Sequence, residues 1–278
     1  MPFQMLVIAV FIAVFGANPY AAAVSPLALP GALQSSEGIG IIAHRGAAAV
    51  APENTLAAAR AGIAQGVEFL EVDAQLTADG VPVLMHDPTV ERTTNGWGPI
   101  AQLTLAEVKT LDAGGWFSAE FAGEPVPTLE EFAAEIDGTP ARALVELKGE
   151  WRLEQVQAAL DLLRARGMVN RVALQSFDLG MLEVLREEAP EFALVMLTRE
   201  WTPTIVERAA QLQVSAIGAR TKLLYARPAL MDRAQGFGIG TLAYTLNSEK
   251  RWAAANDRGV DFVVTDDPVG LADWRGRA

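Results

Sequence analysis

The sequence predicts an α/β protein of the TIM (β/α)8 barrel class. From residue 129 onward, short apolar runs typical of buried strands alternate with longer stretches of helical periodicity. Together with two strands nearer the N-terminus they give eight β and α units in roughly 240 residues, as in such a barrel. Polar residues follow several of these strands, and strand ends form the active-site face of a TIM barrel. A doubly wound open sheet is the competing fold, but no Gly-x-Gly-x-x-Gly motif follows the first strand.

The N-terminus carries the pattern of an export signal. Residues 5–16 form an apolar run of a length typical of a secretory h-region and short for a membrane span, and Ala21-Ala22-Ala23 supplies a small-residue cleavage site. We therefore predict a signal peptide at residues 1–23, a mature chain that begins close to Val24, and a periplasmic or secreted location. Because the n-region has no Lys or Arg, a misassigned start codon and an uncleaved anchor are the alternatives.

The rest of the chain is predicted to be one domain after a flexible lead-in. Residues 24–38 are rich in Pro, Ala and Ser without periodicity, whereas residues 39–278 contain no repeat or low-complexity linker. The net charge of −12 argues against a nucleic-acid partner, since proteins that bind nucleic acids usually carry a basic face. The chain has no cysteine, so the fold must depend on its core and not on disulfides.

The first predicted strand is the buried run Gly40–Ala43, which ends at His44-Arg45-Gly46. The polar residues Pro52-Glu53-Asn54-Thr55 then precede an alanine-rich run to Gln65, the pattern of a capped helix. The other histidine of the chain, His86, closes a second short apolar run. Each imidazole is thus expected at a strand end, the usual place of a catalytic side chain on an α/β scaffold.

The second predicted strand, Phe69–Leu76, continues into a hairpin. Strand alternation puts Glu71 and Asp73 on the same face. Asp79-Gly80 between two apolar runs is a strong hairpin signal and predicts a short antiparallel extension. A two-residue loop at this dipeptide would place Asp73 directly opposite His86.

An irregular insertion is predicted between this hairpin and the next barrel unit. Residues 89–128 contain one predicted helix, Leu105–Leu111, among glycines, prolines and aromatic residues. A segment of this length is more often a binding loop than a linker. Its aromatic residues Trp97, Trp116 and Phe117 either form a wall of the site or simply cover the end of the barrel.

The remaining elements alternate regularly. Strands are predicted at Ala143–Lys148, Arg171–Gln175, Phe192–Leu197, Ser215–Gly218, Gly240–Tyr244 and Phe262–Thr265. Helices are predicted at Leu129–Ile136, Leu153–Arg166, Leu179–Glu188, Thr204–Leu212, Pro228–Gln235 and Ser248–Asn256.

The residues at the strand ends suit the hydrolysis of a phosphate ester. Carboxylates bind a hard divalent cation, Arg and Lys bind phosphate oxygens, and imidazoles transfer protons near neutral pH. Glu146 and Lys148 share one face of a later strand and add a further carboxylate and cation. The competing interpretation is a set of structural histidines and a solvent-facing acidic strand. Against it, the chain has two histidines and both lie at strand ends on either side of the acidic pair.

Seven motifs occur in one order between Ile39 and about Leu271. They are His44-Arg45-Gly46, Pro52-Glu53-Asn54-Thr55, Glu71-Val72-Asp73, His86-Asp87 with Arg92-Thr93-Thr94-Asn95-Gly96, Glu146-Leu147-Lys148, Gln175-Ser176-Phe177 and Thr265-Asp266-Asp267-Pro268. This set resembles the signature of the bacterial glycerophosphodiester phosphodiesterases. One departure is Tyr244, where the family commonly has Trp, and another is a segment before Glu130 that is shorter than the inserted domain of some exported members.

The resemblance implies a TIM barrel that hydrolyses glycerophosphodiesters to sn-glycerol 3-phosphate and an alcohol with a divalent cation, often calcium or magnesium. Carried over by position, it implies that Glu71, Asp73 and Glu146 bind the metal, that His44 and His86 are the acid/base pair, and that Arg45 and Lys148 bind the phosphate. It favours His86 as the acid and His44 as the base. It also suggests that the substrate's own glycerol 2-hydroxyl attacks first and gives a cyclic phosphate, although direct attack by water is equally compatible with the sequence.

The expected partner is thus a small glycerophosphodiester, without nucleic acid and without stable membrane insertion after signal cleavage. A phospholipase-type phosphodiesterase that acts on membrane lipid would keep both histidines and would need an apolar loop, for which Trp116-Phe117 with Phe121 is a candidate. A non-catalytic exported barrel with a phosphate pocket is the alternative of a different class. It predicts that a histidine or carboxylate is lost, and none is missing.

Overall fold

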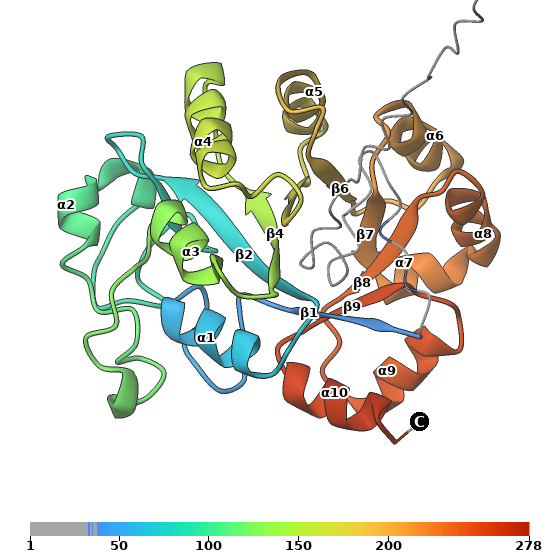
Figure 1. The fold of residues 1–278 in the computed structure, drawn as a ribbon, viewed down its shortest axis with the longest axis horizontal. Coiled ribbons are helices and arrows are strands. Elements are labelled where there is room, and N and C mark those ends of the chain that lie inside the picture. The colour runs from blue at the N-terminus through green and yellow to red at the C-terminus, as the bar shows by residue number, and fades with distance from the viewer. Residues whose placement is uncertain (1–32, 34, 36–37, 278) are drawn as a thin grey trace, which may run out of the picture.

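Within residues 33, 35 and 38–277, which the computed structural model describes, eight parallel strands close into a barrel (Figure 1). Their order around the barrel is β1, β9, β8, β7, β6, β5, β4 and β2, and β1 pairs with both β9 and β2. The strands are β1 Gly40–Ala43, β2 Phe69–Leu76, β4 Arg142–Leu147, β5 Val172–Ser176, β6 Ala193–Leu197, β7 Ala216–Arg220, β8 Gly240–Tyr244 and β9 Phe262–Thr265. The predicted TIM barrel is confirmed. The predicted signal peptide and most of the lead-in lie outside the described residues.

The hairpin extension is confirmed, but its predicted register is wrong by one residue. Strand β3, Pro82–Leu84, pairs antiparallel with β2, and Gln75 lies opposite Val83. The loop is one residue longer than predicted, because the Thr77 amide donates to the Val81 carbonyl. Continued along the strand, this register puts Met85 rather than His86 opposite Asp73, and the Met85 amide donates to the Asp73 carbonyl. His86 follows the strand in a loop.

Helices surround the barrel, and most begin at a capping side chain of the predicted kind (Figure 1). For example, the Thr55 hydroxyl accepts from the Ala58 amide at the start of α1. The helices are α1 Leu56–Ala64, α2 Leu105–Val108, α3 Leu129–Ile136, α4 Leu153–Ala165, α5 Leu179–Glu188, α6 Pro203–Gln211, α7 Thr221–Ala226, α8 Pro228–Gly236, α9 Glu249–Asn256 and α10 Pro268–Arg275. The predicted helix from Leu105 ends at Val108 rather than Leu111, and α7 and α10 were not predicted. None of the helices described is long and apolar enough to cross a membrane.

Alternate residues of each strand face two different cores. Residues such as Leu70, Val72 and Ala74 pack outward against the helices in the larger hydrophobic cluster. Their neighbours face inward and build the barrel interior, where the rings of Phe69 and Phe262 meet edge to face with centroids 5.7 Å apart. The inward face of β2 therefore begins with an aromatic residue and continues with polar ones toward the C-terminal end of the strand.

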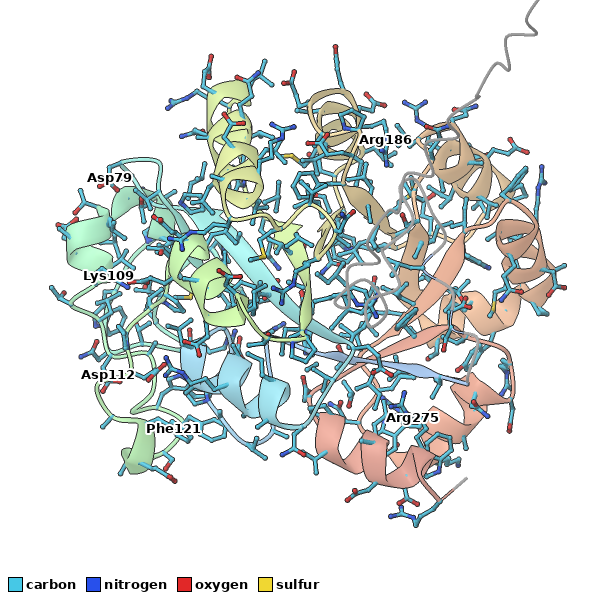
Figure 2. The ribbon with its side chains drawn as sticks, viewed as in Figure 1. Asp79, Lys109, Asp112, Phe121, Arg186 and Arg275 are labelled. Carbon is cyan, nitrogen blue, oxygen red and sulfur yellow. The ribbon has the colours of Figure 1, made fainter. Side chains whose placement is uncertain are left out.

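Several contacts close the N-terminal end of the barrel. Arg275 of α10, labelled in Figure 2, donates from Nη1 to Glu68 Oε1 at 2.6 Å and to the Ile39 carbonyl at 3.1 Å. Leu33 is buried in the interior cluster and its amide donates to the Ser215 carbonyl. The Ser35 amide lies 3.4 Å from Asp261 Oδ1. Leu33 and Ser35 thus contact the barrel although they precede the predicted domain start at residue 39, and that boundary stays a prediction.

The insertion forms a separate lobe at the side of the barrel, on the left of Figure 1. It contains α2 and two short 3-10 helices, Ile100–Gln102 and Ala119–Phe121, and it has its own small hydrophobic core. Lys109, labelled in Figure 2, links it to α3 by donating to Glu131 Oε2 at 2.6 Å. The lobe is therefore tied to the barrel wall rather than folded across the barrel mouth.

Candidate active site

A cavity of about 690 Å³ lies at the C-terminal end of the barrel. The alternation of the strands explains its lining, because the inward-facing position nearest each strand end projects into the mouth. All seven residues that the sequence predicted for the site line this cavity: His44, Arg45, Glu71, Asp73, His86, Glu146 and Lys148. The insertion residues Trp97, Trp116 and Phe117 do not line it, so the suggestion that they form a wall of the site is wrong.

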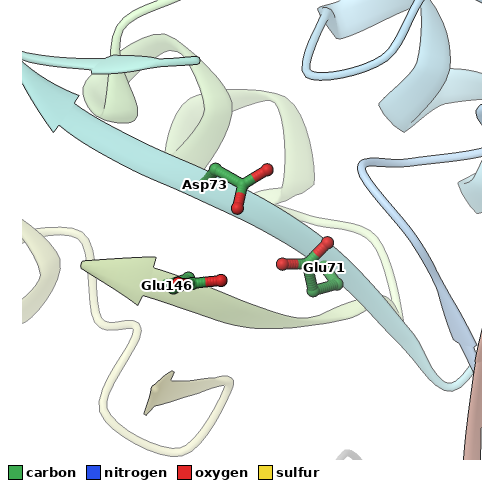
Figure 3. Close-up of side chains that lie close together, drawn as sticks. All are labelled: Glu71, Asp73 and Glu146. Atoms are coloured by element: carbon green, nitrogen blue, oxygen red, sulfur yellow. The ribbon is translucent and has the colours of Figure 1, made fainter. Parts of the chain in front are cut away.

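Three buried carboxylates lie together in the site. Glu71 and Asp73 project from β2 and Glu146 from β4, and Figure 3 shows them facing one another across the two strands. One oxygen from each lies within 4.8 Å of the others, and the residues are 4%, 1% and 8% exposed, respectively. The pairing register puts Asp73 beside Glu146. Parallel pairing of β2 and β4 therefore determines that these side chains converge.

Burial and mutual repulsion make two of the three carboxylates reluctant to ionise. Burial first, and then the charges of Asp73 and Glu146, raise the pKa of Glu71 well above its ordinary value. Burial and the charge of Asp73 raise the pKa of Glu146 to about 7. A cluster of this kind is stabilised by positive charge within it, and oxygen ligands at this spacing fit a hard divalent cation.

Asp73 differs because cations and amide donors surround it. Burial opposes its ionisation, but the positive charges of Lys148 and Arg45 outweigh burial and lower its pKa. Lys148 Nζ lies 3.4 Å from Asp73 Oδ1. The Asn54 side chain donates to Asp73 Oδ2 at 2.8 Å and accepts from the Asp73 amide at 3.0 Å. Asp73 is therefore held as an oriented carboxylate.

Each histidine is oriented by a carboxylate at Nδ1. His44 Nδ1 lies 2.5 Å from Asp266 Oδ1, and His86 Nδ1 lies 2.6 Å from Asp87 Oδ1. Both acids have a lowered pKa: burial of Asp266 is outweighed by its hydrogen bond with His44, and Arg92 lowers the pKa of Asp87 to about 2. An ionised carboxylate can only accept, so each Nδ1 carries the proton and Nε2 remains for other partners.

The two histidines differ in their surroundings. Burial lowers the pKa of His86, although the nearby charge of Asp73 partly opposes this effect. Asp87, which orients His86, also accepts from Arg92 Nε at 2.5 Å. Asp266, which orients His44, also accepts from Asn247 at 2.5 Å. The role of Asp266 was missed from the sequence, although it continues the inward alternation of Phe262 and Val264.

Arg45 is held in a strained turn beneath the cavity. Its φ is 54°, a conformation that costs a non-glycine residue free energy, and such strain concentrates at functional sites. Its amide donates to Glu71 Oε2 at 2.9 Å and its Nη1 to Glu53 Oε1 at 2.6 Å. Glu53 also accepts two hydrogen bonds from Arg92. The Arg45 Nε is buried, lies 3.6 Å from Asp73, and has no hydrogen-bond partner among the described residues.

The opposite wall of the cavity is formed by β6, β7 and β8, and its two arginines were not predicted. Arg199, Arg220 and Tyr244 line it together with Phe177 from the end of β5. The signal was present in the sequence, since Arg199 continues the inward alternation of Val195 and Leu197 beyond the end of β6. The site thus has an acidic side with the histidines and a basic, aromatic side.

Comparison with known proteins identifies relatives of this chain. The profile of the glycerophosphoryl diester phosphodiesterase family matches residues 44–269. A glycerophosphodiester phosphodiesterase of Caldanaerobacter subterraneus is 32% identical over 234 residues, which cover 83% of this chain and 95% of that protein. One of Bacillus subtilis is 31% identical over 281 residues, which cover 94% of this chain and 95% of that protein.

Solved structures agree with the sequence comparison. An Oleispira antarctica phosphodiesterase in complex with the product sn-glycerol-3-phosphate has a TM-score of 0.78 and 30% identity, with 85% of this chain and 96% of that chain covered. A glycerophosphodiester phosphodiesterase from Agrobacterium tumefaciens has a TM-score of 0.72 and 33% identity, with 84% and 99% covered.

Proposed function

The chain belongs to the glycerophosphoryl diester phosphodiesterase family and is a phosphoric diester hydrolase, and from this premise we propose a metal-dependent mechanism with two histidines as acid and base. The substrate is a glycerophosphodiester and the products are sn-glycerol 3-phosphate and an alcohol. The observation that carries the proposal is the cluster of three buried carboxylates in one cavity with two carboxylate-oriented histidines.

Glu71, Asp73 and Glu146 would hold the divalent cation. Their oxygen donors, their burial and the raised pKa values of two of them fit calcium or magnesium. A bound ion would stabilise negative charge on the phosphate oxygens and on the attacking oxygen.

His44 and His86 would exchange protons with the substrate through Nε2. His44 as the base accepts the proton of the attacking hydroxyl, and Asp266 stabilises the imidazolium that results. His86 as the acid donates to the departing alkoxide, while Asp87 keeps its ring in position. Burial lowers the pKa of His86, so its imidazolium gives up a proton more readily than an ordinary one, and a bound phosphodiester anion would favour the protonated form.

Arg45 and Lys148 would bind the phosphate oxygens. Arg45 lines the cavity beside Asp73, and its guanidinium is shaped to donate to two phosphate oxygens. Among the described residues, the nearest acidic partners of Lys148 Nζ are Asp73 at 3.4 Å and Glu146 at 3.8 Å, so its ammonium can also reach an anion in the cavity. Both cations would then stabilise charge that grows on phosphorus-bound oxygens.

Chelation tests the proposal. Purified protein should release sn-glycerol 3-phosphate from a glycerophosphodiester, lose that activity in excess chelator, and regain it with calcium or magnesium. Glu71→Gln and Asp73→Asn should each abolish the recovery, whereas Glu154→Gln on exposed α4 serves as the charge-matched control. Full activity in excess chelator would exclude these residues as ligands of an essential metal.

We also propose that the protein is exported to the periplasm or secreted, with residues 1–23 as the signal peptide. The apolar run at residues 5–16 before three alanines supports this proposal. Mass spectrometry of the protein from its native host should find an N-terminus close to Val24. An intact Met1 on cytoplasmic protein would refute export.

A further inference from the structure

Two arginines stand on the wall of the cavity that faces the catalytic groups. Around the closed barrel, β6 lies opposite β1 and β7 lies opposite β2. Arg199, which follows β6, therefore faces the end of β1 with His44, and Arg220 at the end of β7 faces the acidic pair of β2. Both side chains are exposed to the cavity mouth.

These two guanidinium groups have no acidic partner or side-chain hydrogen bond in the part of the chain that the structure describes. The other cavity cations differ, since Arg45 is paired with Glu53 and Lys148 with Asp73. Asp178 also lines the cavity, but its Oδ1 accepts from the Gly180 and Met181 amides and caps α5. In a chain of net charge −12, two arginines without an acidic partner among the described residues give this cavity mouth a local positive charge, which favours an anion.

An aromatic pair holds this wall in place. The Arg199 guanidinium carbon lies 4.1 Å from the Phe177 ring centroid, a cation–π stack. Phe177 meets Tyr244 edge to face with centroids 6.1 Å apart, and the Tyr244 hydroxyl donates to the Thr198 carbonyl at 3.1 Å. Tyr244 pairs in register with Arg220, so both side chains project to the same side of the sheet.

Building on the proposed function, we propose that this wall binds the leaving alcohol and selects alcohols that carry a further anionic group, such as a second phosphate. Arg45 and Lys148 would bind the phosphodiester itself on the other side of the cavity, and glycerol carries only hydroxyl groups. The alcohol is therefore the part of the substrate that can supply an anion to Arg199 and Arg220. A choline group would instead meet two like charges, and the Phe177 face that could stack on it is already covered by Arg199.

A matched pair of substrates tests the proposal. Glycerophosphoinositol 4-phosphate differs from glycerophosphoinositol by one phosphate, and glycerophosphocholine supplies the cationic alcohol. Hydrolysis of each substrate would release sn-glycerol 3-phosphate, so one assay measures kcat/KM for all three. We expect kcat/KM for glycerophosphoinositol 4-phosphate to exceed that for glycerophosphoinositol on the order of tenfold or more, and we expect glycerophosphocholine to have the lowest kcat/KM of the three. The preference should weaken as salt rises, because the contacts are partly exposed.

Variants then assign the preference to the wall. In the Arg199→Gln/Arg220→Gln double variant the ratio between the two inositol substrates should fall toward one. The ratio is measured on one preparation, so a partly unfolded variant does not change it. Lys222→Gln on α7 removes a charge outside the cavity lining and should keep the wild-type ratio.

The outcomes separate this inference from the proposed function. If the metal-loaded wild type hydrolyses glycerophosphocholine as well as the phosphorylated substrate, the inference is wrong and the proposed function stands. The same holds if the double variant keeps the wild-type ratio. If none of the three substrates releases sn-glycerol 3-phosphate, the proposed function fails and the inference fails with it.

Discussion

At the residue scale, the site combines groups whose charges are controlled by their neighbours. Asp73 stays ionised beside Lys148 and Arg45, while burial and repulsion raise the pKa of Glu146 to about 7. The histidines are fixed in one tautomer by Asp266 and Asp87. Strand alternation predicted the carboxylates, and Asp87 directly follows His86 in the sequence, whereas Asp266 lies 222 residues from His44 and could not be paired with it from the sequence.

Leaving-group chemistry should separate the two histidines. A nitrophenolate needs little protonation when it departs, so loss of the general acid should cost far less with a nitrophenyl ester than with a glycerophosphodiester. Loss of the base should cost the same with both. We expect His86→Ala to show the unequal effect and His44→Ala the equal one, measured as kcat/KM after circular dichroism confirms folding. Equal losses in both variants on both substrates would contradict the division of roles.

Asp266 should act through His44. Replacing it with Asn removes the charge that stabilises the imidazolium and permits the wrong tautomer, so kcat should fall on the order of a hundredfold with little change in KM. Asp273→Asn on α10 is the control, because that residue does not line the cavity. If the Asp266→Asn variant stays within twofold of wild type, Asp266 does not position a catalytic group.

At the scale of elements, patterns with a short period were predicted well and long-range pairings were not. Strands β1, β2, β8 and β9 have the predicted bounds, because short buried runs between polar residues mark them clearly. The hairpin register failed because Asp79-Gly80 sits in a loop one residue longer than the shortest hairpin loop. Helix α10 was missed, although Asp267 and Pro268 form a recognisable start.

The turn that follows β1 should depend on Gly46. Its φ is 83°, and a Cβ there would lie 2.7 Å from the Ala58 carbonyl carbon. Gly46→Ala should therefore displace the His44-Arg45 turn and lower kcat/KM by more than tenfold. Gly66→Ala is matched in backbone conformation, with φ 65° and no contact within 4 Å, and should cost about 1 kcal/mol of stability without loss of activity. Equal activity of the two variants would show that the turn tolerates displacement.

At the scale of the whole molecule, the barrel separates packing from chemistry along its axis. Its N-terminal end is filled by Phe69, Phe262 and Leu33, and its C-terminal end carries the charged groups. Alternation along each strand predicted this division for β2 and β4. The basic wall of β6 and β7 was not predicted, because Arg199 and Arg220 belong to different strands and only the closed barrel brings them to one cavity mouth.

Leu33 should contribute to the stability of the entire barrel, since it is buried in the interior cluster. Leu33→Ala should lower the free energy of unfolding by about 2 kcal/mol. For a domain of this size that corresponds to a decrease of several degrees in the melting temperature. Leu153→Ala, at an exposed position of α4, is the control. Equal melting temperatures for both variants would show that the barrel does not depend on Leu33.

The acidic cluster should reduce the stability of the metal-free protein, and a bound ion should reverse this effect. The pKa of Glu146 is raised to about 7, so the folded protein favours its neutral form, and the stability that this form provides is lost as pH rises from about 4.5 through 7. In excess chelator, Glu146→Gln should therefore melt at a higher temperature than wild type at pH 8 and at nearly the same temperature at pH 5. Calcium or magnesium at a hundred times its Kd should stabilise the wild type at pH 8 by about 2.7 kcal/mol and should stabilise the variant much less. Differential scanning calorimetry of both proteins at the two pH values, with and without the ion, measures these melting temperatures and the stabilisation by the ion. A variant that melts below the metal-free wild type at pH 8 would show that the buried Glu146 carboxylate does not destabilise the protein. A variant that responds to the ion as wild type does would show that Glu146 is not a metal ligand.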